Sequence, residues 1–208
     1  MASIGVIDYG MGNLHSAQKA LEHAAPGARV FLSDNHADLA AADRLVLPGV
    51  GSIGHCMHAL TTRGLDEVVR EAFGQKPLLG ICVGMQLLFE RGEENRGIDT
   101  LGLLPGQVCR LPDEPQLTVP HMGWNQVAQT PHPLWNGIPD QSRFYFVHSY
   151  YRRPADDDYV VGTARHGVEL TAAVAAPQLF AVQFHPEKSH ASGLKLLQNF
   201  AAWDGADG

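Results

Sequence analysis

Residues 78–86 read LLGICVGMQ and combine an apolar strand pattern, a cysteine and two glycines. Cys82 directly follows the apolar residues 78–81, and a helical pattern over residues 85–90 begins almost at once. A sharp strand-to-helix turn of this kind, with Gly80 and Gly84 to either side, holds a nucleophile up into a cleft and gives it room. The helix start favours the thiolate, the reactive form of cysteine. The pattern therefore predicts a nucleophilic thiol at Cys82, whereas a cysteine without such neighbours is more often core packing.

A thiol that attacks an amide needs a base, and the base needs a group that orients it. Both types occur in the sequence HPE at residues 185–187, directly after an apolar strand expected over residues 179–184. The carboxyl ends of parallel strands meet at one edge of a sheet, so His185 is expected beside Cys82. Glu187 is then expected to hold the imidazole across Pro186. By itself, an HPE sequence is more often a surface turn. Its interpretation as a base with an orienting group is supported only in combination with the Cys82 turn.

Residues 47–52, LPGVGS, end another apolar run with two glycines. Such a loop can direct backbone N–H groups at an oxyanion or a phosphate. It lacks the Lys-Ser/Thr of a Walker loop, and its spacing differs from that of a dinucleotide fingerprint. A plain glycine turn is the alternative interpretation. The amide of Val83, which follows the cysteine, is expected to face the same oxyanion.

The first half of the chain alternates short apolar strands with helical patterns. Strands are predicted over residues 4–7, 29–32, 45–47 and 78–81, the third of them stopped at Pro48 and Gly49. Helices are predicted from Leu14, capped by Asn13, and over residues 64–73. This β-α order predicts a mostly parallel sheet with helices on both faces.

The second half is rich in predicted strands separated by Pro, Gly and Asp turns. These strands are expected over residues 107–111, 125–129, 144–147, 159–164 and 169–174. They are predicted to be antiparallel and joined to the same sheet. Another apolar strand over residues 179–184 follows, and a helix over residues 192–203 closes the chain. The acidic residues 156–158 are expected in a solvated turn. The prediction is one domain over residues 1–208, a three-layer α/β sandwich with additional antiparallel strands.

Composition limits the class of function. The 208 residues carry a net charge of −7 with no basic run, which argues against binding nucleic acid. No apolar run is long enough to span a membrane and no signal peptide is evident, so a cytoplasmic location is expected. Three cysteines predict no disulfide framework, and Cys56 and Cys109 are expected to be small buried residues. His55 and His58 with Cys56 form an incomplete set of metal ligands, so no metal and no cofactor is expected.

The motifs around Cys82 and His185 resemble those of the class I glutamine amidotransferases, a triad family with a flavodoxin-like core. Within that family the chain is similar to the glutaminase subunits of imidazole glycerol phosphate synthase, from histidine biosynthesis. The similar segments run in family order from about residue 4 to residue 200. They are IDYGMGNL at 7–14, PGVG at 48–51, PHMGWN at 120–125, YFVHSYY at 145–151 and HPEKS at 185–189.

This resemblance implies residue roles. Cys82 would attack the side-chain amide of L-glutamine to give a glutamyl thioester and ammonia, with His185 moving the proton and Glu187 orienting His185. The oxyanion hole would use the amide of Val83 and one from the Val50–Gly51 loop, after a peptide flip in that loop. The implied glutamine pocket comprises Gly51, Gln86, His148 and Ser149. The implied partner is the synthase's cyclase subunit, a (β/α)8 barrel forming a heterodimer, and the implied docking residues are Asn13, Met122, Trp124, Tyr145 and Lys188.

Three alternatives remain open from the sequence. A paralogous amidotransferase subunit for polysaccharide amino sugars would share the chemistry and differ in its gene neighbours. A cysteine peptidase-like hydrolase would cleave peptides in place of glutamine. A non-catalytic binding subunit has no need to keep Cys82, His185 and Glu187 together. Without the resemblance, Trp124, Met122 and Tyr145 would be read as strand packing.

Overall fold

The computed structural model describes residues 1–113, 117–153 and 159–206. A central eight-stranded sheet runs in the order β2-β1-β3-β4-β14-β13-β12-β9. Its first five strands are parallel, and the last three continue it with antiparallel pairs. The bounds of its strands are β1 Ser3–Ile7, β2 Arg29–Ser33, β3 Arg44–Gly49, β4 Leu78–Cys82, β9 Ala128–Gln129, β12 Val160–His166, β13 Val168–Ala176 and β14 Leu179–Val182.

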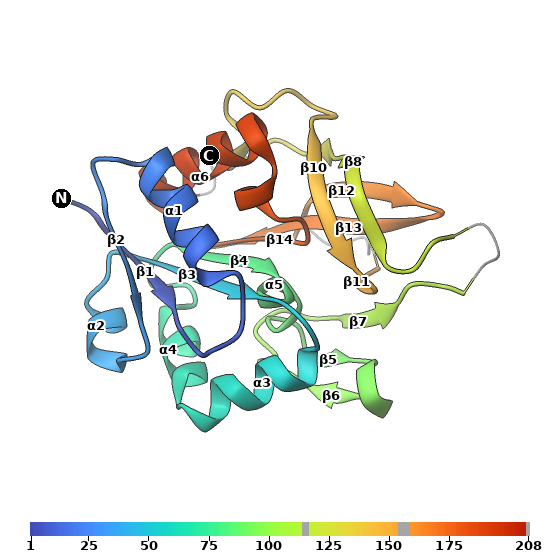
Figure 1. Cartoon of the computed structure of the whole chain (residues 1–208), viewed down its shortest axis with the longest axis horizontal. Coiled ribbons are helices and arrows are strands. Elements are labelled where there is room, and N and C mark those ends of the chain that lie inside the picture. The colour runs from blue at the N-terminus through green and yellow to red at the C-terminus, as the bar shows by residue number, and fades with distance from the viewer. Residues whose placement is uncertain (114–116, 154–158, 207–208) are drawn as a thin grey trace.

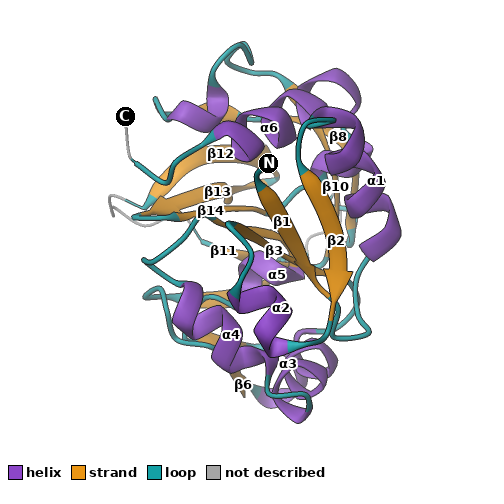
Figure 2. Cartoon of the chain, turned by 90° about the vertical axis from the view of Figure 1, so that its left-hand side faces the viewer, coloured by secondary structure: helices purple, strands orange, loops and turns teal. Residues whose placement is uncertain are grey.

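Helices cover both faces of this sheet, as predicted from the alternating strand and helix patterns. In Figure 2, α1 (Leu14–Ala24) and α6 (His190–Ala202) lie above it. Below it lie α2 (His36–Ala40), α3 (Ile53–Thr62) and α4 (Leu65–Ala72). The central strand β4 is buried along its whole length, which explains why its sequence shows no polar alternation. The three-layer α/β architecture expected from the sequence is confirmed.

Two smaller sheets stand apart from the central one, which corrects the expectation of a single sheet. One is the antiparallel ribbon of β8 (His121–Gln126) and β10 (Arg143–His148). The other has the order β11-β7-β5-β6, and Figure 1 shows both on the side of the molecule away from β2. Its strands are β5 Arg91–Gly92, β6 Ile98–Asp99, β7 Gln107–Arg110 and β11 Tyr150–Arg152. The pattern could not assign strands to sheets, since local alternation does not identify a strand's neighbour.

Several predicted boundaries were wrong for identifiable reasons. Strand β3 continues through Pro48 and Gly49, because a proline carbonyl can still accept hydrogen bonds and only the N–H is lost. The helix expected over residues 85–90 is the single turn α5 (Val83–Gln86). The strand predicted over residues 125–129 is divided between β8 and β9. Helices α2 and α3 were not predicted as elements, and the acidic residues 156–158 lie outside the described part of the chain.

Within the described ranges no helix is both long and apolar enough to cross a membrane. The same ranges contain no cluster of three His, Cys, Asp or Glu side chains arranged to hold a metal ion. All three cysteines are buried and free, which agrees with the expectation that Cys56 and Cys109 are buried.

Candidate active site

Cys82 ends β4 in a backbone conformation that few residues other than glycine adopt, with φ 55° and ψ −111°. The flanking glycines are expected to give the nucleophile room, and the structure shows a further use for them. A Cβ on Gly84 would overlap the carbonyl oxygen of Leu47 in β3, and a Cβ on Gly80 would lie 3.0 Å from that of Ala181. The glycines therefore let neighbouring strands approach the turn closely, and this packing holds Cys82 in its strained conformation.

His185 and Glu187 follow β14, the strand beside β4. Nδ1 of His185 lies 2.8 Å from Oε1 of Glu187, and both side chains are almost completely buried. Burial alone would lower the pKa of His185, but its interactions with Cys82 and Glu187 outweigh burial and raise the pKa to about 10. The ring therefore keeps a proton at neutral pH.

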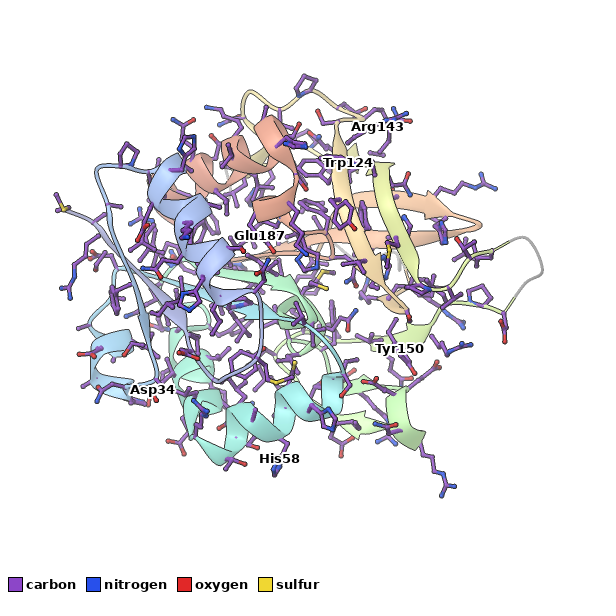
Figure 3. All side chains as sticks on the ribbon, in the orientation of Figure 1. Asp34, His58, Trp124, Arg143, Tyr150 and Glu187 are labelled. Carbon is purple, nitrogen blue, oxygen red and sulfur yellow. The ribbon has the colours of Figure 1, made fainter. Side chains whose placement is uncertain are left out.

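Asn13 contacts this pair in a way that the sequence did not predict. It occupies the N-cap position of α1, but its side chain makes no capping hydrogen bond. Instead Nδ2 of Asn13 donates to Oε1 of Glu187 at 3.4 Å. Figure 3 shows Glu187 beside the start of α1, in the turn η3 (Pro186–Lys188). Asn13 thus helps to fix the carboxylate that contacts His185.

Gln183 is a functional candidate that the sequence analysis missed. It is fully buried, and its Nε2 donates to the Cys82 sulfur at 3.7 Å. Its Oε1 accepts from Nε2 of Gln86, which also donates to the carbonyl of Tyr150. A lone amide in the apolar stretch 179–184 was the available signal, because a buried polar side chain needs partners.

The carboxyl edge of the sheet opens into a cavity of about 590 Å³, within the usual size for a small-molecule site. Most predicted site residues line it: Asn13, Val50, Gly51, Cys82, Val83, Gln86, His148, Ser149, His185 and Lys188. Glu187 lies behind His185, and Met122, Trp124 and Tyr145 lie outside the cavity. Glu94 also lines the cavity and was not predicted; its Oε2 accepts from the amide of Ile53 at 2.6 Å.

Loop 48–51 approaches Cys82 from β3. The N–H of Leu45 donates to Pro77, before β4, whereas the carbonyl of Pro48 accepts from the hydroxyl of Tyr9, beyond β1. Backbone groups along a strand alternate between its two neighbours. Gly49 is in register with Cys82, and by this alternation its backbone groups lie on the side of β4. The start of the loop therefore lies beside the nucleophile.

His148 forms part of the cavity wall through a chain of buried rings. Its Nδ1 lies 2.9 Å from the Tyr150 carbonyl and must donate, so its Nε2 accepts from Nδ1 of His121 at 2.9 Å. Nε2 of His121 then accepts from Asn125 at 3.2 Å. Burial lowers the pKa of His121 to about 3 and that of His148 to about 4, with neighbouring histidines adding to both shifts. Both rings are therefore neutral.

This pair predicts a loss of stability in mild acid. The unfolded rings titrate near pH 6.5 and the folded ones far below, so unfolding takes up protons once the pH falls below about 6.5. The free energy of unfolding should drop by about 1.4 kcal/mol per pH unit for each ring from there toward pH 4. His185, with its pKa raised, is protonated in both states below pH 6.5 and adds nothing in this window.

Urea unfolding at several pH values between 4.5 and 7.5 measures this dependence. His121→Gln removes one of the two rings, so its slope below pH 6.5 should be smaller than that of the unsubstituted protein by about 1.4 kcal/mol per pH unit. Equal slopes in the two proteins would contradict the assignment of a neutral buried His121.

The β8–β10 ribbon carries an apolar outer face next to the cavity. Met122 and Trp124 are 62% and 43% exposed, and Trp124 pairs with Tyr145 in the ribbon's register. Nζ of Lys188 lies 5.9 Å from the centre of the Tyr145 ring, and the Trp124 ring stacks on His190. Figure 3 shows Trp124 beside the ribbon, on the side of the molecule away from β2. The five predicted docking residues thus lie around the cavity or on this adjoining face.

Comparison with known proteins shows the family of the chain and agrees with this fold. The family model for glutamine amidotransferase class-I matches residues 5–202, and the chain belongs to the class I glutamine amidotransferases. Similar curated proteins are the imidazole glycerol phosphate synthase subunit HisH 1 of Pseudomonas aeruginosa and the subunit HisH of Pseudomonas putida. They are 56% and 54% identical to it, and each match covers 99% of both chains. A solved structure named glutamine amidotransferase has a TM-score of 0.73 and 20% identity over 96% of this chain and 99% of that chain, which shows the fold alone.

Proposed function

We propose that this chain is the glutaminase subunit of an imidazole glycerol phosphate synthase and that Cys82, His185 and Glu187 form its catalytic triad. The observation that carries the proposal is the strained Cys82 turn beside the buried His185–Glu187 pair, at the floor of a cavity large enough for glutamine. The full-length similarity to HisH subunits supports the choice of synthase over the paralogous and peptidase-like alternatives.

In the proposed reaction the Cys82 thiolate attacks the side-chain amide carbon of glutamine. The carbonyl π electrons move to oxygen, and the proton on His185 goes to the amide nitrogen as ammonia leaves. Water then attacks the thioester and gives a proton to His185, the carbon–sulfur bond breaks, and the acid product leaves as the Cys82 thiolate re-forms; the acid then loses its proton to water and becomes glutamate. Glu187 holds the imidazole and stabilises its positive charge whenever the ring is protonated.

Binding of glutamine uses groups around the cavity. The Gln86 nitrogen already donates to two protein oxygens, so its own oxygen is the group that accepts from the substrate. Glu94 places a carboxylate at the wall, suited to the substrate's α-ammonium group. Both nitrogens of the His148 ring are occupied, so the backbone at His148 and Ser149 is proposed to bind the ligand, and Gly51 lines the same cavity.

The oxyanion hole is proposed to comprise the amide of Val83 and an amide of the Val50–Gly51 loop. The register of Gly49 places this loop beside Cys82, and rotation of one of its peptides is proposed to aim the amide. Ammonia then passes to a (β/α)8-barrel cyclase docked on the face that bears Met122, Trp124, Tyr145, Lys188 and Asn13. Apolar and aromatic side chains beside a cation suit the centre of a protein interface.

Co-expression with the candidate cyclase tests this assignment. The two chains should co-purify as a heterodimer, and the cyclase substrate should accelerate glutamine hydrolysis. Trp124→Ala removes an exposed apolar side chain and should weaken the complex, whereas Arg143→Ala, on the same ribbon but charged and exposed, should have little effect. A chain that hydrolyses peptides, ignores glutamine and binds no cyclase would contradict the proposal.

Glu187→Gln should lower the maximal rate of glutamine hydrolysis by about 10- to 100-fold. The change replaces a charge-assisted hydrogen bond to His185, worth about 1.5–3 kcal/mol, by a neutral one. The pKa of His185 should fall as well, and this would appear in the pH profile of the maximal rate. The measurement is steady-state kinetics from pH 6 to 10, and an unchanged profile would contradict the role given to Glu187.

A further inference from the structure

Two buried side chains behind loop 48–51 are neither triad members nor part of the cavity wall. The hydroxyl of Tyr9 donates to the carbonyl of Pro48 at 2.6 Å, and the thiol of Cys56 donates to the carbonyl of Val50 at 3.3 Å. Both side chains are completely buried. They reach the loop from different elements, since Tyr9 follows β1 and Cys56 lies in α3.

These two hydrogen bonds hold alternate peptides of the loop. The Pro48 carbonyl belongs to the peptide before Gly49, and the Val50 carbonyl belongs to the peptide after Val50. The Gly49–Val50 peptide lies between them, next to Cys82, with which Gly49 is in register. A peptide plane can rotate through opposite changes in the ψ of one residue and the φ of the next while both flanking peptides stay in place. Glycine at position 49 makes such a rotation sterically accessible.

We propose that Tyr9 and Cys56 are positioning residues that clamp the peptides on either side of Gly49–Val50, so that the loop can rearrange at that one peptide only. The proposal rests on the oxyanion role proposed above for this loop. With both neighbours held, a rotation delivers the Val50 N–H to one place beside Cys82. Without the clamp, the whole loop would have to be ordered each time the hole forms.

The chemistry of both side chains suits a permanent donor. Burial, together with the neighbouring Cys56, raises the pKa of Tyr9 well above its usual value. Burial also raises the pKa of the Cys56 thiol. Both groups therefore keep their protons, and a protonated group can donate. A Cβ at position 49 would lie 2.9 Å from the Tyr9 hydroxyl. Glycine at this position therefore leaves room for the Tyr9 side chain to reach the loop.

The test compares Tyr9→Phe and Cys56→Ala in the complex with the cyclase partner. Each substitution leaves a buried carbonyl without its donor, and the maximal rate of glutamine hydrolysis should fall about tenfold. The Michaelis constant should stay within about twofold, because an oxyanion donor acts in the transition state. Cys56→Ser restores a hydroxyl donor and should recover most of the rate. Cys109→Ala, another buried cysteine, is the matched control and should leave the rate unchanged.

Alkylation of Cys82 by iodoacetamide distinguishes two causes of a lower hydrolysis rate, loss of the clamp and a general loss of structure. In that reaction the sulfur displaces iodide and no oxyanion forms, so the clamp variants should react as fast as the unsubstituted protein. The clamp would be overturned if alkylation and hydrolysis were lost equally, or if the Michaelis constant rose as much as the maximal rate fell. An unchanged maximal rate of hydrolysis would overturn it as well. If Cys56→Ala fails to fold, Tyr9→Phe and Cys56→Ser still decide. Failure of the proposed function is recognised separately, since the unsubstituted complex would then hydrolyse no glutamine.

Discussion

Replacing Cys82 by alanine is expected to lower glutamine-dependent synthesis by the complex by about 10⁴-fold or more, as found when a covalent nucleophile is removed from an enzyme. The same complex should still use ammonium salts at high pH, because the cyclase chemistry is untouched. The physical reason is the strained turn that ends β4, which presents the sulfur at the floor of the cavity beside His185. The measurement is the rate of product formation with glutamine and with ammonium chloride.

The ratio of the two activities makes this experiment decisive. If ammonia-dependent synthesis falls as far as glutamine-dependent synthesis, Cys82 is needed for folding or docking and not for chemistry. Cys109→Ala provides the comparison, since Cys109 is buried and free in β7 and lines no part of the cavity. Its two activities should match those of the unsubstituted complex.

Glutamine hydrolysis by the isolated chain is expected to be about a hundred- to thousandfold slower than hydrolysis by the complex with a bound cyclase ligand. A single oxyanion donor is worth about that factor, and the second donor is proposed to come from the loop that begins at Gly49, in register with Cys82. The gain should appear in the maximal rate more than in the Michaelis constant. Steady-state kinetics of the chain alone, with partner, and with partner and ligand measure it. Full activity from the isolated chain would contradict gating by the loop.

The substitution Gly51→Val tests the same loop by changing one of its own residues. Gly51 has φ +85°, a conformation that a β-branched residue resists, so activation by the partner should fall more than glutamine binding. Gly74→Val is the matched control, because Gly74 has φ +69°, open space around it and no place in the cavity. It carries similar backbone strain, and its activation ratio should stay normal while its stability falls.

The sequence by itself determined which residues could do chemistry and which strands carry them. An apolar run ending in Cys82 and another ending just before His185 can be read locally, since burial of both sheet faces requires continuous apolar strands. The parallel arrangement then followed from the alternating helices, and it placed both side chains at one edge of the sheet. The same local signals identified α1, α4 and α6.

Only the tertiary structure decided the contacts that hold these groups. Gly84 is required by the carbonyl of Leu47, Asn13 bonds to Glu187 and not to its own helix, and Cys56 donates to the Val50 carbonyl. The β8–β10 ribbon separates from the main sheet although its sequence alternates like any other strand pair. Hydrogen bonds and close approaches of this kind join residues up to 174 positions apart, and nothing in a local pattern encodes the partner. They arise when packed layers bring distant side chains within about 3 Å, the range in which a buried polar group must find its partner.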